Sequence, residues 1–405
     1  MNDVGHENDG HLYPRFSDGE YQRRYQAVRE RMAEQGFDAL IVWGQVGIGG
    51  TWQRNIHYLS NYADTHYNGY LIFPMEGDPT LFIAIYPHVR QARMMAVVDD
   101  VRWMTWEPAQ AIVGRIKELG LEGGNIGIVG VTGLYNEPLS VPLNHYRSFR
   151  AELPRATFRD ATAIVEEVRL IKSAEEIAAM EKAAAYTDMG MASLVDHIRA
   201  GASDIELWAS IPCGYLQEGG EYQFQLLGST SMFESSMPYP WKYPARHRIE
   251  QGDIVVTEIS AGYNWYGGQL IRPVAVGEPP DHYKRLFDVA YSAYKRIQEA
   301  VVPGATEKDI LEAAAVISDA GMKIHAPTVH GWSIGIHEPF VGIPGSEAWP
   351  VKPVTFQEGM TIMIEPNPVA ADEESGIFFG SVHVIEQDGA RCLQNYPEEF
   401  VVVEI

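Results

Sequence analysis

The stretch Glu358-Gly-Met-Thr-Ile-Met-Ile-Glu365-Pro366 is an apolar run that ends on a carboxylate followed by a proline. A second run of this kind, Gly252-Asp-Ile-Val-Val-Thr-Glu258, occurs earlier in the chain. Apolar and β-branched residues bounded by glycine or proline predict buried strands. A carboxylate in such a strand must be paired, hydrogen-bonded or shifted in pKa, because burial penalises its charge. The two runs therefore predict two strands, each carrying one glutamate toward the interior.

Two histidines precede the Glu358–Pro366 run, in the stretch His330-Gly-Trp-Ser-Ile-Gly-Ile-His337. Imidazole titrates near neutrality, so a pair of histidines suits proton transfer or metal ligation. Gly331 and Gly335 allow a ligand or another backbone to come close. A histidine in a glycine-rich turn can also be no more than a hydrogen-bonded structural residue.

A hairpin is predicted after Glu258. The turn residues in Tyr263-Asn-Trp-Tyr266 separate the first strand from a returning strand that includes Gln269-Leu-Ile-Arg272. The returning strand places Gln269 and Arg272 in the neighbourhood of Glu258.

A faint internal repeat indicates that the second part of the chain consists of two similar halves. Gly201-Ala-Ser-Asp204 resembles Gly304-Ala-Thr-Glu307, and Ser203 and Thr306 are suitable N-caps for a following helix. The separation is too long for a solenoid repeat. A site between two such halves would draw on strands from both.

The first part of the chain has a different organisation. Residues 1–16 are predicted to be a flexible arm, and residues 17–160 an alternating α/β domain that begins with a helix capped by Ser17 and Glu20. No G-x-G-x-x-G follows a strand, so no dinucleotide site is expected. Residues 161–405 form the second predicted domain.

Composition restricts the partners and the compartment. The chain has 405 residues and a net charge of -23, with 54 acidic and 31 basic side chains, so a nucleic-acid backbone would be repelled. The two cysteines form no metal-like cluster, which is typical of a reducing compartment. The sequence shows neither a signal peptide nor a membrane-spanning apolar stretch. A soluble cytoplasmic protein is predicted.

The chain from about residue 165 onward resembles the pita-bread fold of creatinase, prolidase, aminopeptidase P and methionine aminopeptidase. The resemblance lies in Arg169-Leu-Ile-Lys-Ser-Ala-Glu-Glu-Ile177, the Gly252 strand and its hairpin, the histidine pair with Glu338, and above all Glu358–Pro366. It implies an α/β (α+β) protein with a creatinase-like N-terminal domain and a pita-bread domain of two αββ halves.

The resemblance also implies a homodimer in which the small domain covers the partner's site. Arg54, His57 and His66 could then contribute to that site, although a solvated surface is the simpler expectation for each.

Metallopeptidases of the family hold two divalent ions with two Asp, one His and two Glu. Matching by position places these five ligands at Glu258, Gln269, His330, Glu365 and Gly380. Hard cations need several anionic oxygens, so the amide and the glycine remove much of the required shell. No metal is predicted; if one ion binds, Glu258, Gln269, His330 and Glu365 would hold it.

The predicted activity is hydrolysis without a metal, as in creatinase and ectoine hydrolase, although the retained His330, His337 and Glu365 suggest a separate branch. The substrate would be a small polar amino-acid-like compound with an amide, amidine or guanidine C–N bond. Glu258 would be the nucleophile or general base, and His330 would pass a proton to the leaving nitrogen, aided by His337 and Glu365.

Five residues are predicted to orient the substrate: Tyr266, Gln269, Arg272, Trp332 and Trp241. Arg272 suits a carboxylate, although it could also merely pair with Glu258. The alternatives are an Xaa-Pro type metallopeptidase with an atypical single-metal site, a lyase, and a non-catalytic binding protein on the same fold.

Overall fold

A computed structural model describes residues 12–45, 53–130, 141–235, 243–371 and 373–405. The chain divides into two compact units, Met1–Leu170 and Ile171–Ile405. The division falls after the last helix of the first unit, α6 (Thr162–Leu170), which packs against α1 (Asp18–Gln35). The sequence placed the domain change before this helix, at residue 160. Most of the predicted flexible arm lies outside the described residues, and Phe16 at its end is buried.

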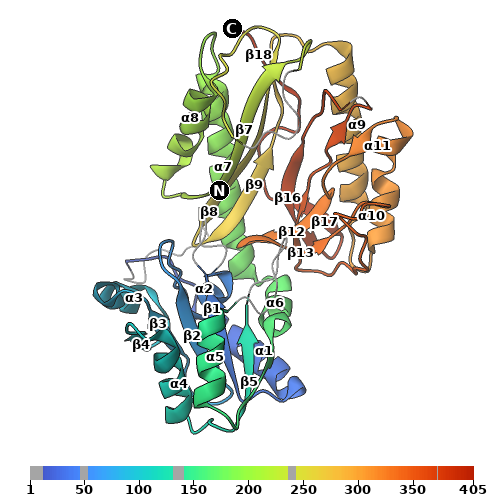
Figure 1. The fold of residues 1–405 in the computed structure, drawn as a ribbon. Coiled ribbons are helices and arrows are strands. Elements are labelled where there is room, and N and C mark those ends of the chain that lie inside the picture. The colour runs from blue at the N-terminus through green and yellow to red at the C-terminus, as the bar shows by residue number, and fades with distance from the viewer. Residues whose placement is uncertain (1–11, 46–52, 131–140, 236–242, 372) are drawn as a thin grey trace. The chain divides into compact units, whose positions relative to one another are not determined.

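The first unit is a six-stranded sheet with helices on both faces (Figure 1). The strand order is β4-β3-β2-β1-β5-β6, and β1 pairs antiparallel with β2 and parallel with β5. The strands are β1 (Ala39–Gly44), β2 (Gly69–Pro74), β3 (Thr80–Ile83), β4 (Asp100–Trp103), β5 (Asn125–Val129) and β6 (Thr157–Asp160). The other helices are α2 (Arg54–Ser60), the 3-10 turn η2 (Tyr86–His88), α3 (Val89–Met95), α4 (Pro108–Glu118) and α5 (Leu143–Glu152).

Alternation along β1 explains the two cores of this unit. Leu40 and Val42 pack into one buried cluster, and Ala39 and Ile41 pack into the other. Successive side chains of a strand point to opposite faces, so a wholly apolar strand requires helices on both sides.

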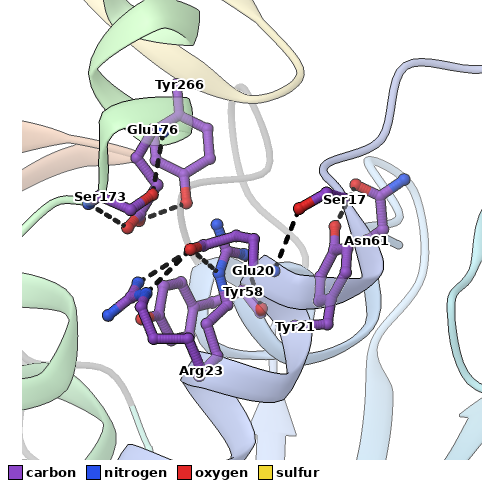
Figure 2. A network of polar contacts seen from close by, with 10 residues as sticks. Ser17, Glu20, Tyr21, Arg23, Tyr58, Asn61, Ser173, Glu176 and Tyr266 are labelled. Atoms are coloured by element: carbon purple, nitrogen blue, oxygen red, sulfur yellow. Dashed lines mark hydrogen bonds and ion pairs between the residues drawn. The ribbon is translucent and has the colours of Figure 1, made fainter.

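The start of α1 shows how local sequence determines a helix boundary. Ser17 caps the helix by accepting from the Glu20 backbone N–H at 3.2 Å, and Gly36 ends it in the left-handed conformation. The Glu20 carboxylate accepts from Arg23 (Figure 2). It also accepts from the fully buried Arg24. Arg24 also donates to the Tyr58 carbonyl oxygen at 2.8 Å, which ties α1 to α2.

The second unit is built on a ten-stranded sheet of order β13-β12-β14-β16-β9-β8-β10-β18, with β7 paired to β8 and β17 to β16. Its strands are β7 (Glu221–Ser231), β8 (Asp253–Tyr263), β9 (Tyr266–Ile271), β10 (Val274–Val276), β12 (Val329–Ser333), β13 (Gly335–Phe340), β14 (Thr361–Ile364), β16 (Gly380–Glu386), β17 (Gly389–Cys392) and β18 (Val401–Val403). A separate pair is β11 (Lys323–Ile324) with β15 (Pro368–Val369).

The helices of this unit belong to two halves, as the repeat predicted. In the first half α7 (Ala174–His197) and α8 (Asp204–Leu216) pack against β7–β9 (Figure 1). In the second half α9 (Asp281–Ala300) packs against β14, β15 and β17, and α10 (Glu307–Ala314) and α11 (Val316–Asp319) pack against α9. Ser203 and Thr306 are N-caps in capping boxes, which confirms that part of the repeat. The pairing of β9 with β16 joins the halves into one sheet.

The sheet of the second unit curls strongly. β12 and β9 are separated by β14 and β16 in the strand order. Even so, a Cβ atom on Gly267 of β9 would lie only 3.0 Å from the Ser333 carbonyl oxygen and 3.0 Å from Trp332 Nε1 of β12. The curl brings strands of both halves against one another. No helix in the described part of the chain combines the length and apolar character needed to span a membrane.

Gly268 provides a test of the packing of α7 on β9. A Cβ atom there would lie 2.6 Å from the Ala184 backbone nitrogen and 2.7 Å from the Ala183 carbonyl. We expect Gly268→Ala to lower the free energy of unfolding by roughly 1–3 kcal/mol, because backbone atoms of α7 must move. Urea denaturation followed by circular dichroism measures the change.

The matched control for this substitution is Gly114→Ala in α4, where nothing lies within 4 Å of the added Cβ. Alanine favours a helix over glycine by about 0.5–1 kcal/mol, so Gly114→Ala should leave stability unchanged or raise it. Equal free energies of unfolding for the two variants would contradict this account of α7.

Candidate active site

Glu258 lies on β8 with its side chain partly exposed. Gln269 of β9 donates from Nε2 to Glu258 Oε2 at 3.1 Å. Burial and the nearby negative charge of Glu365 hold the pKa of Glu258 well above its usual value, against the opposing effect of the Gln269 hydrogen bond. Glu258 is therefore a stronger base than an ordinary glutamate once it has lost its proton.

His330 and Glu365 form a buried ion pair. His330 lies on β12 and Glu365 directly follows β14, and His330 Nε2 is 3.1 Å from Glu365 Oε1. The other ring nitrogen, Nδ1, lies 3.0 Å from the Gly331 carbonyl oxygen, which can only accept. Both ring nitrogens therefore donate. Burial alone would lower the pKa of His330, but the charge of Glu365 and these hydrogen bonds outweigh it and raise the pKa above its usual value.

His337 has a different set of neighbours. Its Nδ1 donates to the Glu338 carbonyl oxygen, and its Nε2 lies 3.4 Å from the Nζ atom of the buried Lys172. In the tautomer that donates from Nδ1, the Nε2 atom can accept a proton from the Lys172 ammonium group. Lys172 belongs to the stretch that resembles the family's entry helix, but its role beside His337 was not predicted. The only sequence signal for Lys172 was its position directly before Ser173, the N-cap of the following helix.

Tyr266 and Arg272 do not reach Glu258. Gln269 shares a face of the sheet with Ser260, its partner across the strand pair, and strand alternation turns Tyr266 and Arg272 to the opposite, helix-covered face. Tyr266 donates to Glu176 Oε1 at 2.8 Å (Figure 2), and Glu176 also completes the capping box of α7.

The buried Arg272 is held by backbone and side-chain oxygens of the second half. It donates to the carbonyl oxygens of Pro397 at 2.7 Å and Gly380 at 2.9 Å and to Ser381 Oγ at 3.1 Å. Its guanidinium stacks on the Phe379 ring. The predicted substrate role and the expected pairing with Glu258 are both replaced by this structural role.

Trp332 lies near the site and Trp241 lies outside the described residues. The Trp332 ring is 5.9 Å from the His330 ring, centroid to centroid.

In the first unit, Arg54 is buried and pairs with Glu166 at 3.1 Å, and His57 is buried as well. The expectation that these two residues lie on a solvated surface is therefore wrong. His66 is exposed.

The residues present do not fit a two-metal centre. Gly380 has no room for the carboxylate expected there, since a Cβ atom would lie 2.6 Å from both Met363 Cε and the Ile364 carbonyl oxygen. Gln269 offers a neutral amide, and Glu365 is already bound by His330. Within the described ranges, no three or more His, Cys, Asp and Glu side chains are grouped as metal ligands.

Comparison with known proteins identifies both units. Residues 178–387 match the model of "Metallopeptidase family M24", and residues 24–171 match "Creatinase/Prolidase N-terminal domain". An Xaa-Pro dipeptidase of Pyrococcus furiosus is 24% identical over 86% of this chain and 92% of its own length. An uncharacterized peptidase of Bacillus subtilis is 25% identical over 89% of this chain and 98% of its own length.

Solved structures share the fold. The X-Pro aminopeptidase of Thermotoga maritima superposes with a TM-score of 0.78 at 20% identity, covering 94% of this chain and 99% of its own. The prediction of a creatinase-like α/β unit followed by a pita-bread unit is confirmed.

The ion pair predicts the effect of Glu365→Gln on His330. Without the carboxylate charge, burial dominates, so the pKa of His330 should fall below its usual value instead of lying above it. Titration of the His330 Cε1 proton by NMR measures the shift, with His330→Asn assigning the signal. Glu338→Gln, a change at a carboxylate that is 45% exposed, is the control and should leave the titration unchanged. An unmoved His330 titration in Glu365→Gln would refute the pairing.

Proposed function

Because the chain belongs to metallopeptidase family M24 and is thereby a hydrolase of C–N bonds, we propose that it hydrolyses an amide, amidine or guanidine C–N bond of a small polar amino-acid-like compound without a metal-bound hydroxide. One observation carries the proposal. Glu258 and the His330–Glu365 pair supply a base and an acid whose pKa values are both raised, in a site that lacks the donors of two metal ions.

Glu258 acts as the general base. Its raised pKa makes the carboxylate a strong acceptor for a proton of the attacking water, and its partial exposure allows water to reach it. The water oxygen bonds to the substrate carbon while its proton passes to Glu258. A cationic amidine or guanidine substrate would also favour loss of the Glu258 proton before attack, because an adjacent positive charge stabilises the carboxylate.

His330 acts as the general acid. Glu365 keeps the imidazole protonated, so His330 can give a proton to the leaving nitrogen as the C–N bond breaks. His337, oriented by the Glu338 carbonyl and Lys172, is then a further hydrogen-bonding group in the site. Glu258 later releases the proton that it took from water, and His330 regains one.

A second candidate is an Xaa-Pro type peptidase with a single metal ion at Glu258, Gln269, His330 and Glu365. The amide oxygen of Gln269 supports it, because this buried atom lacks a hydrogen-bond partner in the described parts of the chain. The similarity to an Xaa-Pro dipeptidase of Pyrococcus furiosus and to an X-Pro aminopeptidase of Thermotoga maritima supports the same substrate class.

We also propose that the protein works as a cytoplasmic homodimer on a small-molecule substrate, with no nucleic-acid or membrane partner. The net charge of -23 and the two free cysteines support this assignment. Light scattering coupled to size-exclusion chromatography tests the dimer.

The decisive experiment combines metal quantification with a panel of creatine, ectoine and Xaa-Pro dipeptides. We expect far less than one metal ion per chain and full turnover of one substrate after treatment with a chelator. About one Mn, Zn or Fe per chain, with activity lost to the chelator and restored by the metal, would establish the second candidate instead.

Glu258→Gln should lower kcat on that substrate by about 10²- to 10⁴-fold, because the amide cannot take a proton from water. Glu250→Gln, an exposed position shortly before β8, is the matched control and should keep full activity. Product analysis separates hydrolysis from elimination by a lyase. Unchanged turnover in Glu258→Gln, or no turnover of any compound by the wild type, would favour a different base or a binding protein.

The pH dependence of kcat/KM follows from the same two groups. Activity should rise as Glu258 loses its proton and fall as His330 loses its proton, which gives a bell-shaped profile. Both pKa values are raised, so both limbs should lie at higher pH than for an ordinary glutamate and histidine. Glu365→Gln should move both limbs to lower pH, since it removes a charge that raises both values. A profile that does not move would exclude these assignments.

A further inference from the structure

Four buried side chains on one face of the second unit's sheet carry polar atoms without hydrogen-bond partners. In the described parts of the chain these atoms are Gln223 Oε1, Ser260 Oγ, Gln269 Oε1 and Trp332 Nε1. Each side chain is at least nine-tenths buried. We call this group the polar row. An unpaired buried polar atom costs about 1–3 kcal/mol, so four on one face require an explanation.

The strand register places the polar row beside the proposed base. Glu258 and Ser260 share one face of β8, and Gln269 lies opposite Ser260 on β9. The next pair on this face is Gly262 with Gly267. Both are covered by the amide of Gln223, whose atoms lie within 2.6 Å of the Cβ positions that these glycines lack. The row thus continues from Glu258, which is partly exposed, into the buried sheet.

A β-bulge and a turn position Gln223. The register of β7 against β8 shifts between Tyr222 and Phe224, which turns Gln223 toward this face. Gln223 Nε2 donates to the Trp265 carbonyl oxygen at 2.7 Å, in a turn where Asn264 and Trp265 have positive φ. The Gln223 amide oxygen is therefore left facing Gly267, where Trp332 Nε1 approaches from β12.

The chemistry of the four atoms defines what can pair with them. The amide nitrogens of Gln223 and Gln269 each already donate one hydrogen bond, so the amide atoms of these residues that are left without any partner in the described parts of the chain are both acceptors. The Trp332 indole offers a donor only, and the Ser260 hydroxyl can do either. A ligand must therefore supply at least two N–H donors next to one acceptor. A carboxylate lacks the donors, and an amidinium or guanidinium lacks the acceptor.

We propose that the polar row binds a carbamoyl group, the –CO–NH2 end of a carboxamide or ureido compound. The two N–H bonds of the group point to Gln269 and Gln223, and its oxygen accepts from Trp332 and from the Ser260 hydroxyl. This assignment deepens the proposed function and rests on it, since it names the substrate class that is held beside Glu258. If this group is the one cleaved, water adds to its carbon, the C–NH2 bond breaks, and the nitrogen leaves as ammonia with a proton from His330.

Gln225 carries a buried atom of the same kind that is unpaired within the described residues, but this atom does not belong to the polar row. Its Oε1 is also buried and without a partner, while its Nε2 donates to the Trp208 carbonyl oxygen at 2.7 Å. Gln225 pairs with Ile259 and therefore faces α8, away from the polar row. A single unpaired atom there indicates no ligand, but it provides a matched position for substitution.

The test observes binding directly and does not depend on turnover. The chain has nine tryptophans, and the indole N–H signal lost in Trp332→Phe identifies Trp332 in spectra of protein labelled with 15N-tryptophan. Acetamide, acetate and acetamidine are probes of equal size that differ only in the terminal group. We expect a saturable shift of the Trp332 signal with acetamide, and no saturable shift with acetate or acetamidine at equal concentration.

Gln223→Leu should weaken acetamide binding at least about tenfold, since it removes one acceptor, and Gln225→Leu should leave it unchanged. Ser260→Ala is the milder variant should Gln223→Leu fail to fold, and it should weaken binding about threefold or more. The eight other indole signals report folding in every sample. Saturation transfer to the acetamide methyl protons provides a second readout that all variants share.

Three outcomes would overturn the carbamoyl assignment. These are equal shifts with all three probes, no shift with acetamide, and undiminished binding in both Gln223→Leu and Ser260→Ala. The proposed function fails separately, if Glu258→Gln retains full hydrolytic activity while acetamide still binds. Hydrolysis that depends on Glu258 without acetamide binding would refute the carbamoyl assignment alone.

Discussion

The candidate site depends on two carboxylates that strands of different halves carry into one curled sheet. Glu258 and Glu365 are close enough for the charge of one to raise the pKa of the other. Two such charges cannot both be buried without compensation. Glu365 is compensated by His330, and Glu258 by a raised pKa and an amide hydrogen bond. A base and a protonated imidazole are thus a consequence of the need to accommodate two acids in one interior.

On the opposite face of β8 and β9, the side chains described above make structural contacts with the rest of the second unit. Helix α7 packs so closely on β9 that Gly268 has no room for a side chain, and Tyr266 bonds to the residue that completes the α7 capping box. Arg272 satisfies backbone carbonyls that join the halves. The polar residues on this face thus hold the framework together, whereas several polar atoms on the other face lack hydrogen-bond partners in the described parts of the chain.

The family fold is present, and two of the five positions that the resemblance matches to metal ligands carry no carboxylate or imidazole. The strands that would present five ligands are all in place, yet one position carries an amide and another a glycine packed against Met363 and Ile364. A fold of this kind tolerates the change because its stability comes from sheet pairing and helix packing, which do not require an ion. In the activity that we propose, the same strands present hydrogen-bonding groups to the substrate.

Sequence alone determined the order of the elements, both units, and the N-caps at Ser203 and Thr306, because these signals are local in the chain. It also singled out Glu258, His330 and Glu365, which the structure places near one another. Along a strand, side chains alternate between the two faces, so the sequence also implied that Gln269 faces away from Tyr266 and Arg272. The prediction of a shared role considered only their closeness in the hairpin. Only the tertiary structure decided which distant groups meet: Lys172 with His337, and Gln223 with Trp332 across Gly267. Those meetings depend on a bulge and on the curl of a ten-stranded sheet, which arise from long-range pairing and leave no periodic pattern in the chain.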